Sequence, residues 1–534
     1  MMRGACISAA ALALVAAAPA HARDRHVTIA PYIELDQVLT ADVQNGDVLT
    51  YTSVAAGVDA SVQTRRTQVQ ISYQYQHHFA WKKGDADQDV HSGLARAAVE
   101  VAPGFSIEGG AIATRTRSDI RGDAPGILTG NQRNVTQVYS AYAGPTLATH
   151  AGPIGINAGY RYGYTKVESP GATGVAPGSP KLDAFDDART QVAQVSAGVK
   201  SGTVLPVGVT VSGAWERDDA GELDQRYDGK YARGDVVLPV SGTVAVTGGA
   251  GYEKIKVSQR DPVVDGTGQP VTDSNGHFVT DKASPRRIAY QTDGLIWDAG
   301  VIWRPSPRTT LEARAGRRYG SMSYTGSLSY AMSKSVGLQI GVYDGIETFG
   351  RQLQDGLAAL PTSFIAQRDA FGQQFNGCVY GTSGSAAGGC LNGVFQSIST
   401  ASYRARGVDA VLSASRGPLS FGFGAGYANR HFYAPDSAPG TVVSGVEDQS
   451  YYGQFYVSRQ LDRNSGITGD VFANYYNSGL ADAPAIVSTG ATGSYYRNFG
   501  HLSTTASVGI YSFHVDGAQS DTQAQGLLGA RYTF

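Results

Sequence analysis

The chain has 534 residues, of which 68 are Gly and 30 are Tyr, and charged residues make up only 16%. Its formal net charge is −2 and it carries no nucleic-acid-binding motif, so we expect no nucleic-acid partner. No window beyond the N-terminus is apolar enough for a transmembrane helix. A mean hydropathy of −0.19 still allows membrane-spanning strands in which apolar and polar residues alternate.

Residues 1–22 have the pattern of a secretory signal peptide. Arg3 precedes an Ala-rich apolar run from Ile7 to Ala18, and Ala20-His21-Ala22 is a small-x-small cleavage pattern. The apolar run is too short to cross a membrane, and Cys6 lies before it, so no cysteine is left for a lipid anchor. We therefore expect an exported mature chain, 23–534, that forms one domain.

Apolar and polar residues alternate with a period of two through most of this mature chain. In 154–165, for example, Ile, Ala and Tyr side chains share one face, and Asn157, Arg161 and Thr165 share the other. The pattern predicts strands at 27–42, 50–62, 67–79, 91–101, 104–116, 135–148, 154–166, 189–201, 206–216, 227–238, 242–256, 288–303, 309–319, 322–333, 336–347, 402–414, 419–430, 449–460, 466–477, 490–498, 501–514 and 523–534.

The lengths of the predicted connections alternate. Every second connection is tight, such as Ala102-Pro103 and Arg416-Gly417-Pro418, whereas most of the others are long and polar, such as 257–287. This alternation is typical of transmembrane barrels, which have short periplasmic turns and long extracellular loops. We therefore predict an all-β fold: a single antiparallel up-and-down barrel of about 22 strands, with roughly 18 to 24 as the range.

The last nine residues, 526–534, favour the same interpretation. Leu528, Ala530, Tyr532 and Phe534 fall on one face of a strand that ends the chain. The pattern Gly529-x-x-Tyr532-x-Phe534 resembles the C-terminal signal by which bacterial outer-membrane barrels are recognised by their assembly machinery. The resemblance implies location in the outer membrane of a Gram-negative bacterium, with membrane lipid and that machinery as partners.

The longest predicted connection is 348–401. Its apolar residues Phe364, Ile365, Phe371 and Phe375 are compatible with a short helix resting on the barrel wall. Two interpretations stay open: a plug that folds into the barrel, or an exposed surface loop. Cys378 and Cys390 lie in this segment, and in an oxidising periplasm we expect a disulfide between them.

Charged residues that alternate with lipid-facing positions are expected to point into a polar lumen. Functionally they could set solute selectivity, and structurally they could simply pair across strands. The candidates are Arg96, Glu100, Arg161, Asp298, Glu312, Arg314, Arg318 and Asp470. Their mixed signs argue against a strongly anion- or cation-selective pore.

Aromatic residues near predicted strand ends suit the girdles of a membrane barrel. These residues are Tyr32, Phe79, Trp81, Trp303, Tyr319, Phe432, Tyr433, Tyr451 and Tyr452.

Catalytic hypotheses are weaker. His77 and His78 are expected at a strand end as rim residues, and no group of residues has metal-ligand spacing, so we predict neither a metal nor a cofactor. A Ser–His hydrolase built around His514 stays as an alternative, but no nucleophile-elbow motif is present. We predict that the protein is not an enzyme and has no catalytic residues.

The segment 303–330 resembles a family of uncharacterised outer-membrane barrels associated with PEP-CTERM and exopolysaccharide loci. The likeness lies in Pro305-Ser306-Pro307-Arg308-Thr309 and Gly316-Arg317-Arg318-Tyr319-Gly320, with Pro31-Tyr32 and Leu49-Thr50-Tyr51 nearer the N-terminus. It implies a role in polysaccharide export or surface assembly, with polysaccharide or its export machinery as partner.

Three functional hypotheses follow. The favoured one is a channel or export component that allows passive passage through a polar lumen. The second is a structural or adhesive surface protein whose barrel is closed by 348–401. The third is the barrel-embedded hydrolase.

Overall fold

The computed structural model describes residues 26–44, 46, 48–81, 88–117, 135–168, 183–365, 371, 377–396, 398–435, 444–480, 483–517 and 520–534. The predicted signal peptide, 1–22, lies outside these residues. No helix in the described ranges is long and apolar enough to cross a membrane.

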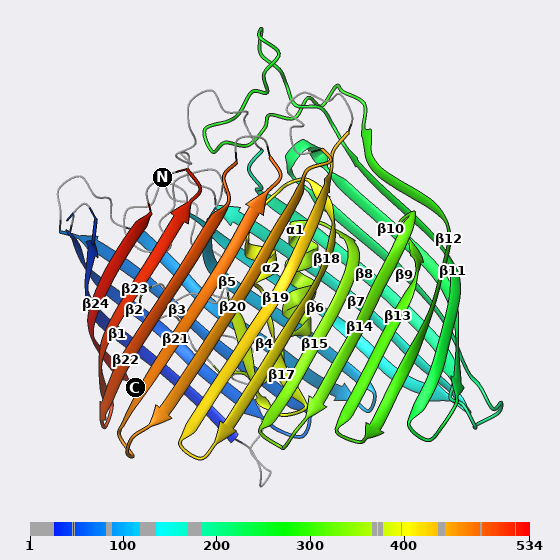
Figure 1. The fold of residues 1–534 in the computed structure, drawn as a ribbon, viewed down its shortest axis with the longest axis horizontal. Coiled ribbons are helices and arrows are strands. Elements are labelled where there is room, and N and C mark those ends of the chain that lie inside the picture. The colour runs from blue at the N-terminus through cyan, green and yellow to red at the C-terminus, as the bar shows by residue number, and fades with distance from the viewer. Residues whose placement is uncertain are drawn as a thin grey trace.

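The described chain is dominated by one closed antiparallel sheet of 22 strands (Figure 1). Its strands are β1 (His26–Asp42), β2 (Val48–Gln63), β3 (Thr67–Ala80), β4 (Gln88–Ala102), β5 (Phe105–Arg117), β6 (Val135–Ala151), β7 (Ile154–Glu168), β8 (Asp187–Val199), β9 (Gly208–Ala220), β10 (Arg226–Pro239), β11 (Val244–Gln259), β12 (Arg287–Ser306), β13 (Thr309–Arg318), β14 (Ser321–Ala331), β15 (Val336–Glu347), β18 (Ser402–Arg416), β19 (Leu419–Tyr433), β20 (Glu447–Gln460), β21 (Ser465–Ser478), β22 (Ile486–Phe499), β23 (Leu502–Val515) and β24 (Asp521–Thr533).

The sheet closes because its first and last strands pair. β24 runs antiparallel to β1 from Tyr32↔Thr533 to Asp42↔Gln523, and the N–H of Phe534 donates to the carbonyl of Pro31 at 3.0 Å. Each strand of the ring therefore has a partner on both sides, which removes the free edges of an open sheet. The predicted barrel of about 22 strands is confirmed.

Shorter segments interrupt or connect the wall. A 3-10 helix, η1 (Glu222–Asp224), joins β9 to β10. The long connection between β15 and β18 contains α1 (Phe349–Ala359), the paired strands β16 (Cys378–Ser383) and β17 (Ala386–Cys390), and α2 (Asn392–Phe395). We call residues 348–401 the insertion.

Most tight turns lie at one rim of the barrel, as the sequence predicts, and the start of β1 and the end of β24 lie at that rim too. Two connections depart from the pattern. The external turn from β13 to β14 is only Tyr319-Gly320, in which both residues have positive φ (54° and 76°), and the turn 200–207 at the opposite rim is longer than predicted. In outer-membrane barrels the short-turn rim faces the periplasm.

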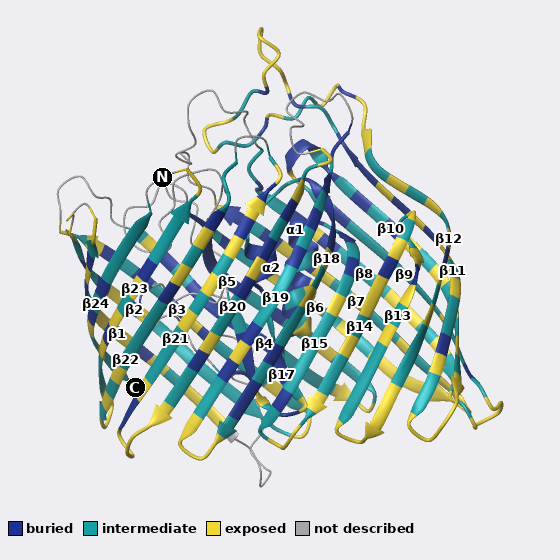
Figure 2. Cartoon of the chain, viewed as in Figure 1, coloured by how far each residue is buried: buried dark blue, intermediate teal, exposed yellow. Residues whose placement is uncertain are grey.

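The two faces of each strand differ as alternation requires (Figure 2). On β24, Leu528 is 69% exposed and Phe534 65%, whereas Gln525 and Leu527 are buried inside the ring. Exposed apolar side chains recur around the ring, for example Val211, Leu295 and Val508. A closed sheet with an apolar outer face and a polar inner face is the architecture of an outer-membrane barrel.

Some of the aromatic residues predicted for the interfacial girdles face the interior instead. Phe79, Trp81, Trp303 and Tyr451 are exposed, but Tyr32, Phe432 and Tyr452 are buried at 2%, 5% and 7% exposure. Because side chains alternate along a strand, the neighbours Tyr451 and Tyr452 cannot both face lipid. The prediction was therefore wrong for these three residues.

Two neighbouring residues of β8 give a direct test of which face of the sheet lies against lipid. Val195 is 53% exposed on the outer face, and its neighbour Gln194 faces inward, where Gly159 of β7 lies opposite it. Val195→Lys should destabilise the barrel by about 2–4 kcal/mol if it lies near the bilayer midplane, because the ammonium group enters lipid. Gln194→Lys should cost much less. Urea unfolding in lipid vesicles, followed by heat-modifiable gel migration, measures both, and equal destabilisation would contradict the assigned facing.

Candidate functional site

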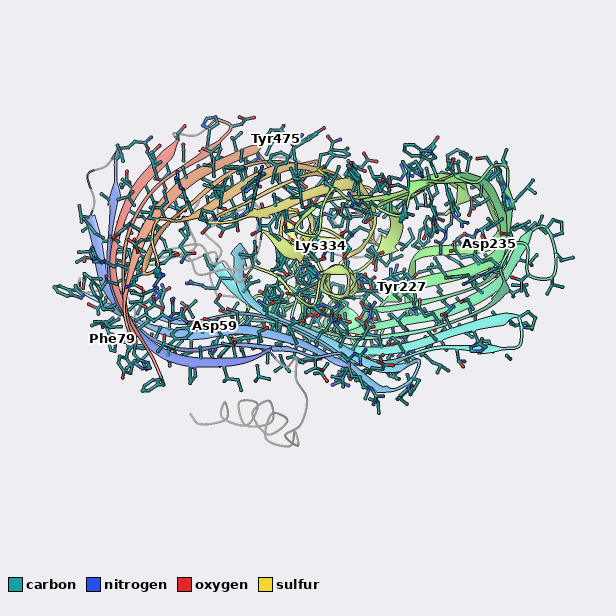
Figure 3. The ribbon with its side chains drawn as sticks, turned by 90° about the horizontal axis from the view of Figure 1, so that it is seen from below. Asp59, Phe79, Tyr227, Asp235, Lys334 and Tyr475 are labelled. Carbon is teal, nitrogen blue, oxygen red and sulfur yellow. A yellow bond between two sulfur atoms is a disulfide. The ribbon has the colours of Figure 1, made fainter. Side chains whose placement is uncertain are left out.

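The insertion lies inside the ring and reaches both of its opposing walls (Figure 3). On one wall it contacts Gln70 of β3, Arg96 of β4 and Arg161 of β7. On the other it contacts Tyr403 of β18 and Gln454 of β20. It therefore bridges the barrel interior from wall to wall.

One face of α1 is apolar and forms the centre of the largest hydrophobic core. Phe349, Leu353 and Leu357 recur every fourth residue, as one helix face requires, and none is more than 1% exposed. They pack with residues from both the wall and the insertion, among them Leu94, Ile112, Val138, Val167, Phe185, Leu360, Phe364, Val379, Leu391, Val394 and Phe395. Burying this apolar surface is the main force that holds α1 against the wall.

The start of α1 is fixed by polar contacts. Thr348 caps the helix by accepting from the N–H of Arg351, and its hydroxyl donates to Asp218 of β9. The Arg351 guanidinium pairs with Glu216 of β9 at 2.6 Å and Glu347 at 3.0 Å, and it lies over the ring of Tyr227 with 4.0 Å to the centroid. Since Arg351 is only 2% exposed, these partners compensate a charge that would otherwise be costly to bury.

Two of the predicted lumen residues, Arg96 and Arg161, hold the rest of α1. Arg96 donates to the carbonyls of Leu360 at 3.1 Å and Ala358 at 3.0 Å, which are free acceptors because a helix leaves its last carbonyls unpaired. Arg161 forms an ion pair with Asp355. Both arginines thus bind the insertion.

The second half of the insertion is a disulfide-linked hairpin that lies against β15, β18 and β19 and is bonded to Gln454 of β20. Cys378 and Cys390 are joined by a disulfide and are paired residues of β16 and β17. The N–H of Cys378 donates to Gln454 at 2.8 Å, and Gln454 in turn donates to Asp470 at 3.0 Å. Asp470, another predicted lumen residue, therefore orients the side chain that holds the hairpin.

The hairpin reaches the periplasmic rim. The N–H of Gly384, at its tip, donates to the carbonyl of Lys334 at 2.9 Å, and Lys334 lies in the tight turn between β14 and β15. In Figure 3 the labelled Lys334 lies beside the insertion. The insertion therefore extends from the external end of β15 to the opposite rim.

Glycines in the wall mark the places where the insertion rests. A Cβ at Gly163 of β7 would lie 2.0 Å from Oε1 of Gln354, and one at Gly422 of β19 would lie 2.4 Å from the ring of Tyr380. A Cβ at Gly424 would lie 2.2 Å from Sγ of Cys378. These separations are shorter than van der Waals contact, so only Gly allows the insertion to approach this closely.

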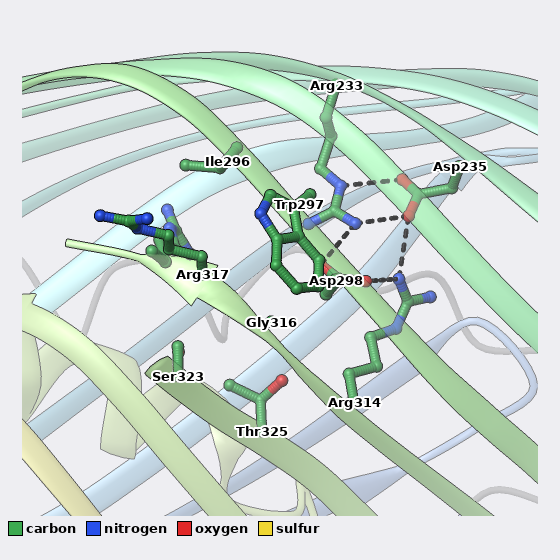
Figure 4. Close-up of a pocket in the computed structure, with 11 residues that line it drawn as sticks. Arg233, Asp235, Ile296, Trp297, Asp298, Arg314, Gly316, Arg317, Ser323 and Thr325 are labelled. Carbon is green, nitrogen blue, oxygen red and sulfur yellow. Dashed lines mark hydrogen bonds and ion pairs between the residues drawn. The ribbon is translucent and has the colours of Figure 1, made fainter. Parts of the chain in front are cut away.

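Three further predicted lumen residues form one charge network on the wall away from α1 (Figure 4). Arg233 pairs with Asp235 at 2.6 Å and Asp298 at 2.8 Å, and Arg314 pairs with the same two carboxylates at 2.8 and 3.2 Å. Glu312 pairs with Arg314 at 2.7 Å. The network borders a cavity of about 280 Å³. Because the charges alternate in sign, this wall presents no strong field of one sign.

The last two lumen candidates lie at opposite ends of the barrel. Arg318, at the external end of β13, pairs with the buried Glu253 of β11 at 2.6 Å. Glu100 lies near the periplasmic end of β4, where its N–H donates to the carbonyl of Arg66 at 2.7 Å. Neither contacts α1 through a described hydrogen bond or ion pair.

The helix in the insertion is not where the sequence suggested. Phe364 and Ile365 are extended: Phe364 forms an isolated bridge with Gly381, and Ile365 donates to Tyr380. The helix forms earlier, over 349–359, because Thr348 supplies an N-cap and Pro361 follows its end. Phe371 packs on Tyr511, and Phe375 lies outside the described residues.

His514 has both a serine and a carboxylate near it. Its Nδ1 is 2.8 Å from Oγ of Ser520, and its Nε2 is 3.6 Å from Asp516. The second distance exceeds a hydrogen bond, and the Asp516 side chain is 66% exposed. A catalytic triad needs a carboxylate that holds the imidazole in place, so this arrangement does not support the hydrolase hypothesis. His77 is a half-buried partner of the exposed Asp89, and His78 is buried beside Tyr51.

The residues of the predicted assembly signal occupy different faces of β24. Tyr532 and Phe534 point outward, with ring centroids 5.3 Å apart. Gly529 is paired with Asp36 of β1, and a Cβ there would lie 2.3 Å from Oδ1 of Asp36. Gly529 thus allows β1 and β24 to close over a buried carboxylate. Their part in recognition by the assembly machinery stays a prediction.

Several residues of the site were not predicted from the sequence. Arg351, Asp355 and Gln354 lie in the insertion, and their wall partners Glu216 and Asp218 were not among the lumen candidates. Alternation along β9 already places Glu216 and Asp218 on one face. Pairing them with α1, however, required the position of the insertion.

Comparisons with known proteins add little beyond shape. No family model matches the chain, and no curated protein matches it. Among solved structures, the ferric-catecholate import receptor Fiu from E. coli K12 is 10% identical, with 94% of this chain and 81% of that chain covered and a TM-score of 0.43. The FrpB iron transporter from Neisseria meningitidis (F5-1 variant) is 10% identical, with 95% and 82% covered and a TM-score of 0.44. At these values the similarities carry no argument about cargo or partners.

The close approach at Gly163 gives a test of how α1 is held. Gly163→Val should force Gln354 and the helix away from β7, because Gln354 is fully buried and bonded to Thr165 at 3.3 Å. We expect faster amide hydrogen exchange over 349–359, with the wall strands unchanged. Gly234→Val is the matched control, since a Cβ at that strand glycine has no atom within 4 Å. Unchanged exchange in the Gly163 variant would contradict the docking described.

Proposed function

We propose that this protein is an outer-membrane channel for a hydrophilic solute, closed by its own insertion. The observation that carries the proposal is that 348–401 bridges opposing walls and extends to the periplasmic rim. A barrel of 22 strands is too wide to be filled by wall side chains alone, so its interior is either open to water or occupied by a separate segment.

The contacts of the insertion favour closure as the resting state. Its apolar core is buried, and the two charged groups that the structure describes in it, Arg351 and Asp355, are paired with the wall. Passage of a solute would require α1, the hairpin, or both to leave the wall. Among the described lumen residues, the balanced charges of the Arg233–Arg314 network favour a neutral or weakly charged solute.

The proposed cargo class is polysaccharide, in export or surface assembly. Its support is the resemblance of 303–330 to barrels associated with exopolysaccharide. In the structure, Pro307-Arg308 of that segment forms the periplasmic turn between β12 and β13, and Tyr319-Gly320 forms the tight external turn. A structural or adhesive barrel is the second candidate, favoured by the same wall-to-wall closure.

Removal of the insertion separates these candidates. Glu347 and Tyr403 are paired neighbours on β15 and β18, so a short Gly-Ser linker between Glu347 and Ser402 can replace 348–401 without breaking the sheet. In planar bilayers the intact protein should be nearly silent, and the deletion variant should give steady, large conductance steps. Soluble fragments of exopolysaccharide should then block the open steps transiently.

The control is the double variant Cys378→Ser/Cys390→Ser, which keeps the insertion but removes its disulfide. It should give brief openings rather than steady conductance. If the folded deletion variant is as silent as the intact protein, the channel proposal is wrong and the structural role is favoured. Steady conductance without any block by polysaccharide would reject only the cargo class.

A further inference from the structure

Three external connections meet above β7 to β11 and bring a histidine together with carboxylates. Asp183 and Asp186 precede β8, Glu222 begins η1, and His277 lies in the β11–β12 connection, which rises highest above the strands in Figure 1. One ligand atom from each of Asp186, Glu222 and His277 lies within 4.8 Å of the others. These three residues are far apart in the sequence, so the fold alone assembles them.

Glu222 is the unusual member of this cluster. It is 4% exposed, and within the described part of the chain neither of its carboxylate oxygens has a hydrogen-bond partner from another residue. Nε2 of His277 is also buried and has no hydrogen-bond partner among the residues that the structure describes. Buried polar atoms are costly unless something satisfies them.

The surrounding contacts hold the imidazole in the orientation that a metal ligand requires. The His277 ring presents Nδ1 to Asp273 at 3.3 Å, which leaves the buried Nε2 as the ring nitrogen available to a ligand. Asp273 also accepts the N–H of His277 at 3.0 Å and that of Asn275 at 2.8 Å. A carboxylate behind the second ring nitrogen is the usual support of a metal-bound histidine.

The charges of the cluster match a divalent ion. Metal binding displaces protons from carboxyl ligands, so in the bound state Asp183, Asp186 and Glu222 carry three negative charges. Lys166, which pairs with Oδ1 of Asp186, supplies one positive charge. With neutral His277, two negative charges remain. One imidazole nitrogen with carboxylate oxygens suits zinc and similar transition metals better than calcium or magnesium, which prefer oxygen ligands alone.

We propose that Asp186, Glu222 and His277 bind a zinc-class divalent metal ion that fastens the three external connections to one another. The bound ion has a structural role and is distinct from the solute of the channel. The ion also restricts movement of the connection that precedes β8. That connection contacts the insertion, because Phe185, between Asp183 and Asp186, packs on Phe349 of α1 with ring centroids 5.2 Å apart. The N–H of Phe278, next to His277, donates to Asp183 at 2.7 Å and so links the β11–β12 connection to the segment that precedes β8.

Zinc titration of the full-length, chelator-treated protein in detergent tests the site. Isothermal calorimetry and metal analysis after gel filtration should give one zinc ion per chain, and the ion should raise the unfolding temperature. His277→Ala and Glu222→Gln should each weaken binding by more than about 10-fold. Heat-modifiable migration establishes that each variant is folded.

His431→Ala is the matched control, because His431 is also paired with a carboxylate, Glu447, near the external end of the barrel but lies outside the cluster. It should bind zinc as the unchanged protein does. Binding that persists in both cluster variants would show adventitious surface sites and overturn the proposal. An absence of binding in the unchanged protein would overturn it as well.

Discussion

The hydrogen bonding of the backbone in lipid is the constraint on which the rest of this structure depends. A strand in the bilayer has no water to satisfy its N–H and C=O groups, so every strand must pair on both sides. The pairing of β1 with β24 meets that requirement and fixes the ring at 22 strands. Once the ring is closed, alternation places one side chain in lipid and the next in the interior, which explains a chain of moderate hydropathy that still spans a membrane.

Closure of the ring leaves an interior that is too wide for the wall side chains to fill. The insertion occupies this interior and is held there by two kinds of contact. Burial of the apolar core around Leu353 and Leu357 holds α1 against the wall but does not fix its exact position. The ion pairs and hydrogen bonds of Arg96, Arg161 and Arg351 fix that position. Wall glycines such as Gly163 and Gly424 allow the approach. Part of the high glycine content therefore follows from an occupied interior.

The strand pattern could be predicted from the sequence because it depends on local alternation. The predicted strands 27–42 and 523–534 agree with β1 and β24 to within one or two residues at each end. The alternation of short and long connections supported an even number of strands. Alternation also placed Arg161 and Arg314 on the polar face. What these residues contact could not be predicted, since Asp355 is 194 positions from Arg161 and Asp235 is 79 from Arg314. The apolar residues of 361–377 do not mark the position of the helix, because its start is fixed by the N-cap at Thr348.

The central claim is that the insertion occupies the barrel interior in the membrane, and a thiol trap tests it most directly. Gly393 of α2 lies against β19, where its Cβ would be 3.4 Å from Cβ of Ala428, close to the usual Cβ–Cβ separation of a disulfide. In the double variant Gly393→Cys/Ala428→Cys, mass spectrometry of the protein from intact outer membranes should find residues 393 and 428 joined by a disulfide in most molecules, whereas Gly393→Cys combined with Gly234→Cys should leave both introduced thiols free. Free thiols at both 393 and 428 in the folded barrel would contradict the account.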